Sequence, residues 1–147
     1  MTTSERFSIS TADWQQERVQ LQQIRREVFI IEQSVPEELE WDGRDDDALH
    51  LKAISAEGNI IGTARLLSDA HIGRVAVVRE WRSCGVGTAM MMDIFRQAER
   101  LGYRQLELAA QISAIPFYEK LGFECHGEAF MDAGIPHINM SRDVRSR

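Results

Sequence analysis

The chain has 147 residues, of which 44% are hydrophobic and 27% charged, and this size and composition predict one globular domain over residues 1–147. Its formal net charge of −6 and its pI near 5.2 argue against a nucleic-acid-binding protein. Cys84 and Cys125 suggest no disulfide framework or metal-binding spacing. The sequence shows no signal-peptide pattern and no apolar run near the ~18 residues of a membrane helix. We therefore expect a cytoplasmic protein without a membrane partner.

The first half of the chain contains one helical pattern followed by a hairpin. Asp13 is placed to begin a helix in which Leu21, Ile24, Val28 and Ile31 recur at helical spacing. Two alternating segments around a Glu57-Gly58-Asn59 turn predict paired strands. The predicted elements are a strand at 6–10, a helix at 14–32, a helical turn after Pro36, and strands at 48–55 and 60–67.

The second half alternates strands and helices and ends on two strands. Gly102 follows a predicted helix at the C-cap position, and Ser113 is placed to cap a shorter one. The predicted elements are a strand at 71–78, a helix from 86 to 101, a strand at 104–109, a helix at 114–121, and strands at 123–130 and 137–141. The order β-α-β-β-β-α-β-α-β-β predicts an α+β fold, a mixed central β-sheet with helices on both faces.

A glycine loop joins the strand that ends at Val78 to the next helix. Gly85 and Gly87 allow unusual backbone angles and a close approach to a ligand. The first amides of a helix lack partners within it, and the helix dipole favours an anion there, so the loop is typical of a phosphate or pyrophosphate site. A nucleotide-binding protein is disfavoured because no Walker lysine follows the loop. Cys84 in this loop is not expected to be a nucleophile.

The stretch from Glu37 to Asp47 is the most acidic part of the chain. Such a run is usually a solvated loop. Trp41 within it is compatible with a second interpretation, in which the loop lines a pocket for a cation. The acidity favours a small cationic amine as substrate, and the sequence leaves both interpretations open.

Two segments resemble the signatures of one enzyme superfamily. Arg82-x-x-Gly85-x-Gly87, after a Val-Ala-Val strand, is similar to the acyl-CoA pyrophosphate loop of the GNAT N-acetyltransferases, and the segment 114–123 resembles their second signature. Further segments are similar to the YjcF-like branch of this superfamily, and the likeness runs from about residue 20 to 141. These segments are 27–33, 35–42, His50, 62–67, 73–77 and 134–137.

The resemblance implies a GNAT fold that binds acetyl-CoA. The pyrophosphate would lie on the loop from Arg82 to Thr88, and the pantetheine would lie between splayed strands ending at Val78 and Ala110. The backbone N–H of Val77 would contact the oxyanion. Gln111 stands where many members have asparagine, so we expect the amide contacts there to differ in detail without loss of cofactor binding. The implied cofactor-binding residues are Val75, Ala76, Val77, Arg82, Ser83, Cys84, Gly85, Val86, Gly87, Thr88, Gln111, Ala114, Phe117, Tyr118 and Lys120.

The resemblance also implies chemistry for Tyr118, whose phenol would give a proton to the leaving thiolate. The sequence does not single out a base for the attacking amine. Its candidates are Glu32, Glu40, Asp42, Asp47, His50, His71 and His137, and His137 is preferred because it begins a closing strand. The acceptor pocket is expected to include Phe29, Glu32, Gln33, Glu40, Trp41 and His50.

We therefore expect an N-acetyltransferase that moves acetyl from acetyl-CoA directly to a primary amine of a small-molecule acceptor. The alternative is a non-catalytic acyl-CoA-binding or regulatory module on the same fold. No metal is expected, because the histidines lack ligand spacing. The identity of the acceptor and the formation of a homodimer are left open.

Overall fold

The computed structural model describes residues 6–145, and its helices and strands follow the predicted order. The first half holds one long helix that continues as a π-helix, a short helix and three strands. The second half begins with β4 and the long helix α4. The bounds are β1 Phe7–Ala12, α2 Trp14–Arg25, η1 Arg26–Glu32, α3 Glu37–Glu40, β2 Leu49–Ser55, β3 Ile60–Leu66, β4 His71–Val77, η2 Arg79–Trp81, α4 Val86–Arg100, β5 Gln105–Gln111, η3 Ile112–Ala114, α5 Ile115–Lys120, β6 Glu124–Asp132 and β7 Ile135–Asp143.

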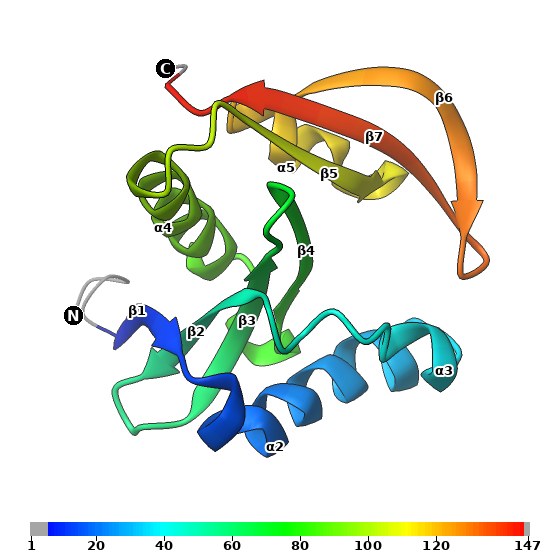
Figure 1. Ribbon diagram of the computed structural model, residues 1–147. Helices are drawn as coiled ribbons and strands as arrows, with labels where there is room; N and C mark the ends of the chain where they lie inside the picture. The colour runs from blue at the N-terminus through cyan, green and yellow to red at the C-terminus, as the bar shows by residue number, and fades with distance from the viewer. Residues whose placement is uncertain (1–5, 146–147) are drawn as a thin grey trace.

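All seven strands belong to one mixed sheet in the order β1-β2-β3-β4-β5-β7-β6. Every neighbouring pair is antiparallel except β4 and β5, which run parallel and are joined through α4. In Figure 1, β5, β7 and β6 with α5 form the upper part of the molecule, and β1, β2 and β3 with α2 form the lower part. β4 lies between the two parts.

Helices α2 and α4 pack on opposite faces of the first four strands. A Cβ built at Gly62 of β3 would lie 3.2 Å from Met90 and Val86 side-chain atoms, so this face of β3 meets α4. Arg65, three residues further along β3, points to the other face and donates to Asp45, which also accepts a hydrogen bond from Arg25 of α2. Because successive strand side chains point to opposite faces, the two helices sandwich the sheet.

β4 pairs with β5 only where the two strands begin. The parallel register contains His71 with Glu107 and Ile72 with Leu108, and no later residue of β4 pairs with β5. β4 also has a bulge in this region. Thr63 and Arg65 of β3 pair with Ala76 and Gly73 of β4, so two residues of β4 lie opposite one residue of β3. The two strands therefore separate toward their carboxyl ends.

Arg74 sits inside the bulge of β4 with a φ of +53°, in the left-handed region. For a residue with a side chain this conformation costs on the order of 1–3 kcal/mol. The surrounding sheet must supply that energy, and such strain is concentrated at functional sites. The bulge therefore marks the middle of β4 as a place where local geometry has been shaped at the expense of stability.

Most boundaries agree with the sequence-based prediction, and the structure differs from it in three features. The helix predicted over 14–32 has that extent, but its last seven residues form a π-helix, η1. Asp13 caps it as expected, whereas the predicted cap at Ser113 is wrong, since Ala114 occupies the N-cap of α5 without a side-chain bond. The closing strands are longer than predicted because Ala133 and Gly134, with φ of +53° and +77°, make a tight turn between them.

The neighbouring residues Met91 and Met92 of α4 provide a test of the core. Met91 has 0% and Met92 has 45% of its surface exposed. We expect Met91→Ala to lower the free energy of unfolding by about 2–5 kcal/mol, because it leaves a cavity. Met92→Ala is expected to change it by less than about 0.5 kcal/mol. Urea denaturation of both variants measures the difference, and equal losses would contradict this packing.

Candidate active site

The glycine loop places open amides at the start of α4. Gly85 is the N-cap residue with φ +88°, and no side chain caps the helix. The first backbone bond runs from Ala89 N to Gly85 O at 3.0 Å, so the amides of Val86, Gly87 and Thr88 precede the helical ladder. Unpaired amides at the positive end of the helix dipole favour an anion. The loop can therefore hold a phosphate group.

The Arg82 side chain turns away from this helix end. Its Nη1 and Nη2 donate to the Glu32 carboxylate at 2.6 and 2.9 Å, and its Nε donates to the Val77 carbonyl at 2.9 Å. The hydrogen bond from Arg82 lowers the pKa of Glu32 below its usual range. Arg82 thus links the loop to the last residue of η1 and to the end of β4.

The backbone of Val77 faces the space between β4 and β5. Val78 N donates to Ile61 O of β3 at 3.0 Å. Because alternate residues of an antiparallel strand turn their N–H and C=O groups to opposite edges, the groups of Val77 point away from β3. The Val77 carbonyl is already bonded to Arg82, while its N–H is directed toward the gap. The geometry therefore offers one backbone donor beside the open amides of α4.

A cavity of about 680 Å³ lies between the diverging strands and the segment from η1 to α3. It brings together several predicted site residues from both halves of the chain. These are Phe29, Gln33, Glu40, Val75, Gln111, Ala114, Tyr118 and His137. Gln111 Nε2 donates to Gln33 Oε1 at 2.8 Å, so the end of β5 is joined to the end of η1.

Tyr118 of α5 lines this cavity between two other rings. Its ring lies edge-on to Phe117 at 5.0 Å and to Phe123 at 5.9 Å. Burial raises the pKa of Tyr118 to about 12, so the phenol stays protonated at neutral pH. Tyr118 can therefore donate a proton or a hydrogen bond, and it cannot act as a base there.

His137 of β7 lines the same cavity with a defined ring orientation. Its Nδ1 lies 2.7 Å from the Ile135 carbonyl, and its ring stacks on Phe130 at 6.0 Å. A carbonyl oxygen only accepts, so Nδ1 carries a proton. In the neutral ring the lone pair is then on Nε2. That nitrogen can accept a proton.

Several residues predicted for the acceptor pocket lie elsewhere. His50 is 3% exposed, stacks on Trp14 at 4.5 Å and has Nε2 2.8 Å from the Asp45 carbonyl. Burial lowers the pKa of His50, which favours the neutral ring. Trp41 donates to Glu37 at 3.4 Å and lies beneath the guanidinium of Arg25. Neither His50 nor Trp41 lines the cavity.

Most of the other predicted residues do not line the cavity. Residues 82–88 form the loop before α4 and its first turn, Ala76 is buried in β4, and Lys120 is exposed. Phe117 packs against the core and against Gly87, where a Cβ would come within 3.3 Å of its ring. Among the base candidates, His71 does line the cavity and lies between Asp69 and Glu107 at 3.2 and 3.4 Å, whereas Asp47 is exposed and does not line it.

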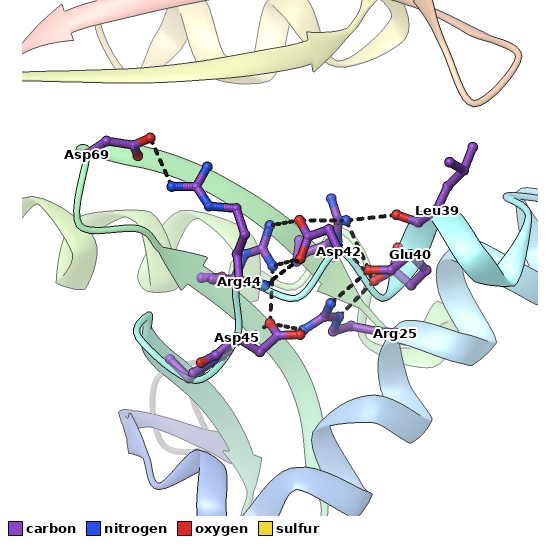
Figure 2. A network of polar contacts seen from close by, with 10 residues as sticks. Arg25, Leu39, Glu40, Asp42, Arg44, Asp45 and Asp69 are labelled. Atoms are coloured by element: carbon purple, nitrogen blue, oxygen red, sulfur yellow. Dashed lines mark hydrogen bonds and ion pairs between the residues drawn. The ribbon is translucent and has the colours of Figure 1, made fainter.

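Three carboxylates of the acidic loop, Glu40, Asp42 and Asp45, are paired with arginines, and Figure 2 shows Arg25 beside two of them. Arg25 contacts the carboxylates of Glu40 and Asp45 at 2.8 and 2.6 Å. Arg65 binds both oxygens of Asp42 at 2.9 and 2.8 Å and reaches Asp45 at 3.1 Å. Arg74 adds contacts to Glu40 and Asp42 at 3.1 and 3.2 Å. We call this set (Arg25, Glu40, Asp42, Asp45, Arg65 and Arg74) the arginine–carboxylate network.

Burial and pairing have opposite effects on the pKa values within this network. Burial would raise the pKa of Asp42 and Asp45, but the hydrogen bonds and charges of Arg65 and Arg25 outweigh it and hold both below their usual range. For Glu40 burial outweighs its arginine partners and raises the pKa. Asp42 and Asp45 are therefore firmly ionised at neutral pH.

The sequence analysis missed Arg25, Arg65 and Arg74 as site residues. A signal was present for Arg65, because a charged residue in the apolar run 60–67 has to find a partner when it is buried. Arg25 lies on the apolar face of its helix together with Leu21 and is 1% exposed. No local pattern indicates which carboxylates these arginines bind, since the partners are 15 to 34 residues away.

The diverging parallel strands, the open helix end and the cavity beside them define an acyl-CoA-dependent acyltransferase fold. Residues 10–144 match the family model for the acetyltransferase (GNAT) domain. The chain is 35% identical over 123 residues to the uncharacterized N-acetyltransferase YjcF of Bacillus subtilis, covering 82% of this chain and 88% of that protein. The chain therefore belongs to the GNAT acetyltransferase family.

Solved structures agree with this assignment. An acyl-CoA N-acyltransferase from Pseudomonas aeruginosa is 32% identical, with a TM-score of 0.80 over 92% of this chain and 97% of that one. Escherichia coli ElaA is 27% identical, with a TM-score of 0.81 over 92% and 99%. An aminoglycoside 6′-N-acetyltransferase complexed with coenzyme A shares the fold at 14% identity, with a TM-score of 0.75 over 95% and 98%. Among the helices of residues 6–145, none has the length and apolarity needed to span a membrane.

The neighbouring residues Arg25 and Arg26 allow a buried arginine of the network to be compared with an exposed arginine outside it. Arg25 is buried, whereas Arg26 is exposed and pairs with Glu37. Arg25→Met leaves Glu40 and Asp45 short of a cation, and we expect it to lower the free energy of unfolding by about 3–5 kcal/mol. Arg26→Met is expected to have a much smaller effect, because solvent screens the exposed pair of Arg26 with Glu37. Chemical denaturation measures both, and similar midpoints would contradict the role of the network.

Proposed function

We propose that this protein transfers an acetyl group from acetyl-CoA directly to a primary amine. The observation that carries the proposal is the separation of β4 from β5 directly beside the open amides of α4. Membership of the GNAT family supports it, and so does the coenzyme A complex of a protein with the same fold. A single domain and a cytoplasmic location are part of the proposal, and the formation of a homodimer stays open.

In this proposal the pyrophosphate of acetyl-CoA lies on the amides of residues 86–88. The pantetheine then enters the gap, where the unpaired edge of β4 offers hydrogen bonds as a neighbouring strand would. The Val77 N–H faces this gap and is free to polarise the thioester carbonyl. Gln111 and Ala114 border the same space from the β5 side.

The proposed transfer is one displacement at the thioester carbon. The neutral amine attacks this carbon, the carbonyl oxygen takes negative charge, and the Val77 N–H stabilises it. The carbon–sulfur bond then breaks, and Tyr118 supplies a proton to the thiolate. His137 Nε2 takes the proton that the amine nitrogen loses. The products are an N-acetylated amine and free CoA.

Binding of acetyl-CoA tests the role of the glycine loop. Gly85 and Gly58 have nearly equal φ values of +88° and +89°, but Gly58 lies in the β2–β3 turn. Gly85→Val is expected to weaken acetyl-CoA binding about tenfold or more, because the strained loop no longer presents its amides to the pyrophosphate. Gly58→Val carries the same strain without this loss.

Isothermal titration with acetyl-CoA, CoA and ATP measures this effect, with circular dichroism to show that each variant is folded. Selective binding of acyl-CoA by the wild type is the expected result. Equal acetyl-CoA affinity in a folded Gly85→Val protein would rule out the proposed pyrophosphate seat. Binding without release of CoA thiol in the presence of any amine would favour a non-catalytic module.

The Tyr118→Phe variant tests the proton donor. We expect it to lower kcat about 100-fold while acetyl-CoA still binds, because only the hydroxyl is removed. Burial raises the pKa of Tyr118 to about 12, so ionisation of this phenol should not reduce wild-type kcat until the pH approaches that value. Thiol release measured against pH in both proteins tests this, with Tyr103→Phe as the control tyrosine. An unchanged kcat in Tyr118→Phe would exclude the assignment.

A further inference from the structure

The charge around the cavity is balanced, although the protein as a whole carries −6. Its lining contains the carboxylates of Glu40, Asp42 and Asp132 and the guanidinium groups of Arg44, Arg65 and Arg74, which sum to zero. Glu40 and Asp42 are already bound within the arginine–carboxylate network. A dication or polyamine therefore finds no excess of negative charge here, which removes the sequence-based reason to expect a strongly cationic acceptor.

One carboxylate of the lining has no partner. Asp132 ends β6 next to the turn that leads to His137, and its side chain makes no hydrogen bond or ion pair with any other residue in the described range 6–145. Both Asp132 and His137 line the cavity. This side of the site can therefore hold the single positive charge of one ammonium group beside the proposed base.

Arg74 lines another part of the cavity and has unused donors. Its Nη2 donates to the carbonyls of Leu39 and Glu40, whereas Nη1 makes no hydrogen bond within residues 6–145. Its Nε is buried without a hydrogen bond, although it lies 3.1 Å from Glu40 Oε2. Figure 2 shows Glu40 facing Arg25, and Asp42 is paired with Arg65. Because Nε is buried and Nη2 is already bonded, Nη1 is the nitrogen of Arg74 that can donate to an incoming carboxylate.

The backbone supports a role for Arg74 in the site. It occupies the strained bulge of β4, three residues before Val77. In a regular strand three residues span about 10 Å, and this is an upper bound for the backbone here because the bulge at Arg74 shortens the path. Groups bound at Arg74 and at the Val77 N–H would be separated by a distance of this order. That separation fits a terminal amine joined to its anionic group by a short carbon chain better than it fits the α-amine of an amino acid.

We propose that the acceptor is a zwitterionic ω-amino acid, whose carboxylate binds Arg74 while its terminal amine lies between Asp132, His137 and the thioester. This inference rests on the proposed acetyl transfer and specifies its substrate class. A zwitterion matches the zero net charge of the lining, the unpartnered carboxylate of Asp132 and the unused Nη1 of Arg74. The bound ammonium group first releases one proton to solvent, and the neutral amine then attacks the thioester carbon as the carbon–sulfur bond breaks. His137 Nε2 takes the second nitrogen proton, Tyr118 protonates the CoA thiolate, and the products are an N-acetyl amino acid and CoA.

A matched amine panel tests the proposal. Wild-type protein is assayed by CoA thiol release with ω-amino acids of three to six carbons, and with n-alkylamines and α,ω-diamines of the same carbon counts. We expect kcat/KM for the best amino acid to exceed its matched alkylamine and diamine about tenfold or more, the effect of one charge-assisted hydrogen bond. Phosphoethanolamine is included to separate a carboxylate from a phosphate.

Variants of Arg74 connect this preference to the residue. Arg74→Gln should raise KM for the amino acid and bring its advantage over the alkylamine close to one, and Arg74→Lys should restore part of it. Arg18→Gln, at an exposed arginine of α2, should leave the preference unchanged. Circular dichroism checks that each variant is folded.

Preference for a diamine, an alkylamine or the phosphate compound would overturn the zwitterion and leave acetyl transfer standing. An amino-acid preference that survives Arg74→Gln would overturn the assignment of Arg74. Absence of turnover with every ω-amino acid would also overturn this inference. The proposed function fails separately, if the wild type does not bind acetyl-CoA.

Discussion

The divergence of β4 from β5 is the constraint on which the rest of the site depends. Two parallel strands that stay paired leave no room between them, and here the pairing stops after Ile72 and Leu108. The divergence exposes one edge of β4 and opens the cavity against η1 and α3. A continuous sheet would bury that edge in backbone hydrogen bonds, so the fold gives up ladder bonds to create a binding surface.

The arginine–carboxylate network is the second constraint, because it fixes the wall opposite the diverging strands. Buried ion pairs contribute little net stability compared with apolar packing, but losing one partner is costly. The network therefore acts mainly by specifying one position for residues 40–45 over β3 and β4. Its cost is visible in the raised pKa of Glu40, whose charged form is disfavoured by burial.

Hydrophobic periodicity and turn residues were enough to predict the order of elements and most of their boundaries. The glycine loop was also predictable, since Gly85 and Gly87 themselves indicate a tight turn that needs glycine's backbone freedom. The network was not predictable, because Arg25, Arg65 and Asp42 come together only after α2, β3 and the acidic loop have packed. His50 was misplaced for a related reason, as strand alternation does not reveal that Trp14 and Asp45 enclose its ring.

The π-helix η1 shows why the donor and acceptor sides of this site cannot be treated separately. Its last residue, Glu32, binds Arg82 of the glycine loop, and the next residue, Gln33, accepts a hydrogen bond from Gln111 at the end of β5. One short segment is thus fastened to both strands of the gap at their carboxyl ends. Phe29 of the same segment lines the cavity. Because a π-helix is less favourable than an α-helix and is found mostly at functional sites, these two anchoring contacts explain how the last turns of a long helix are held in this form.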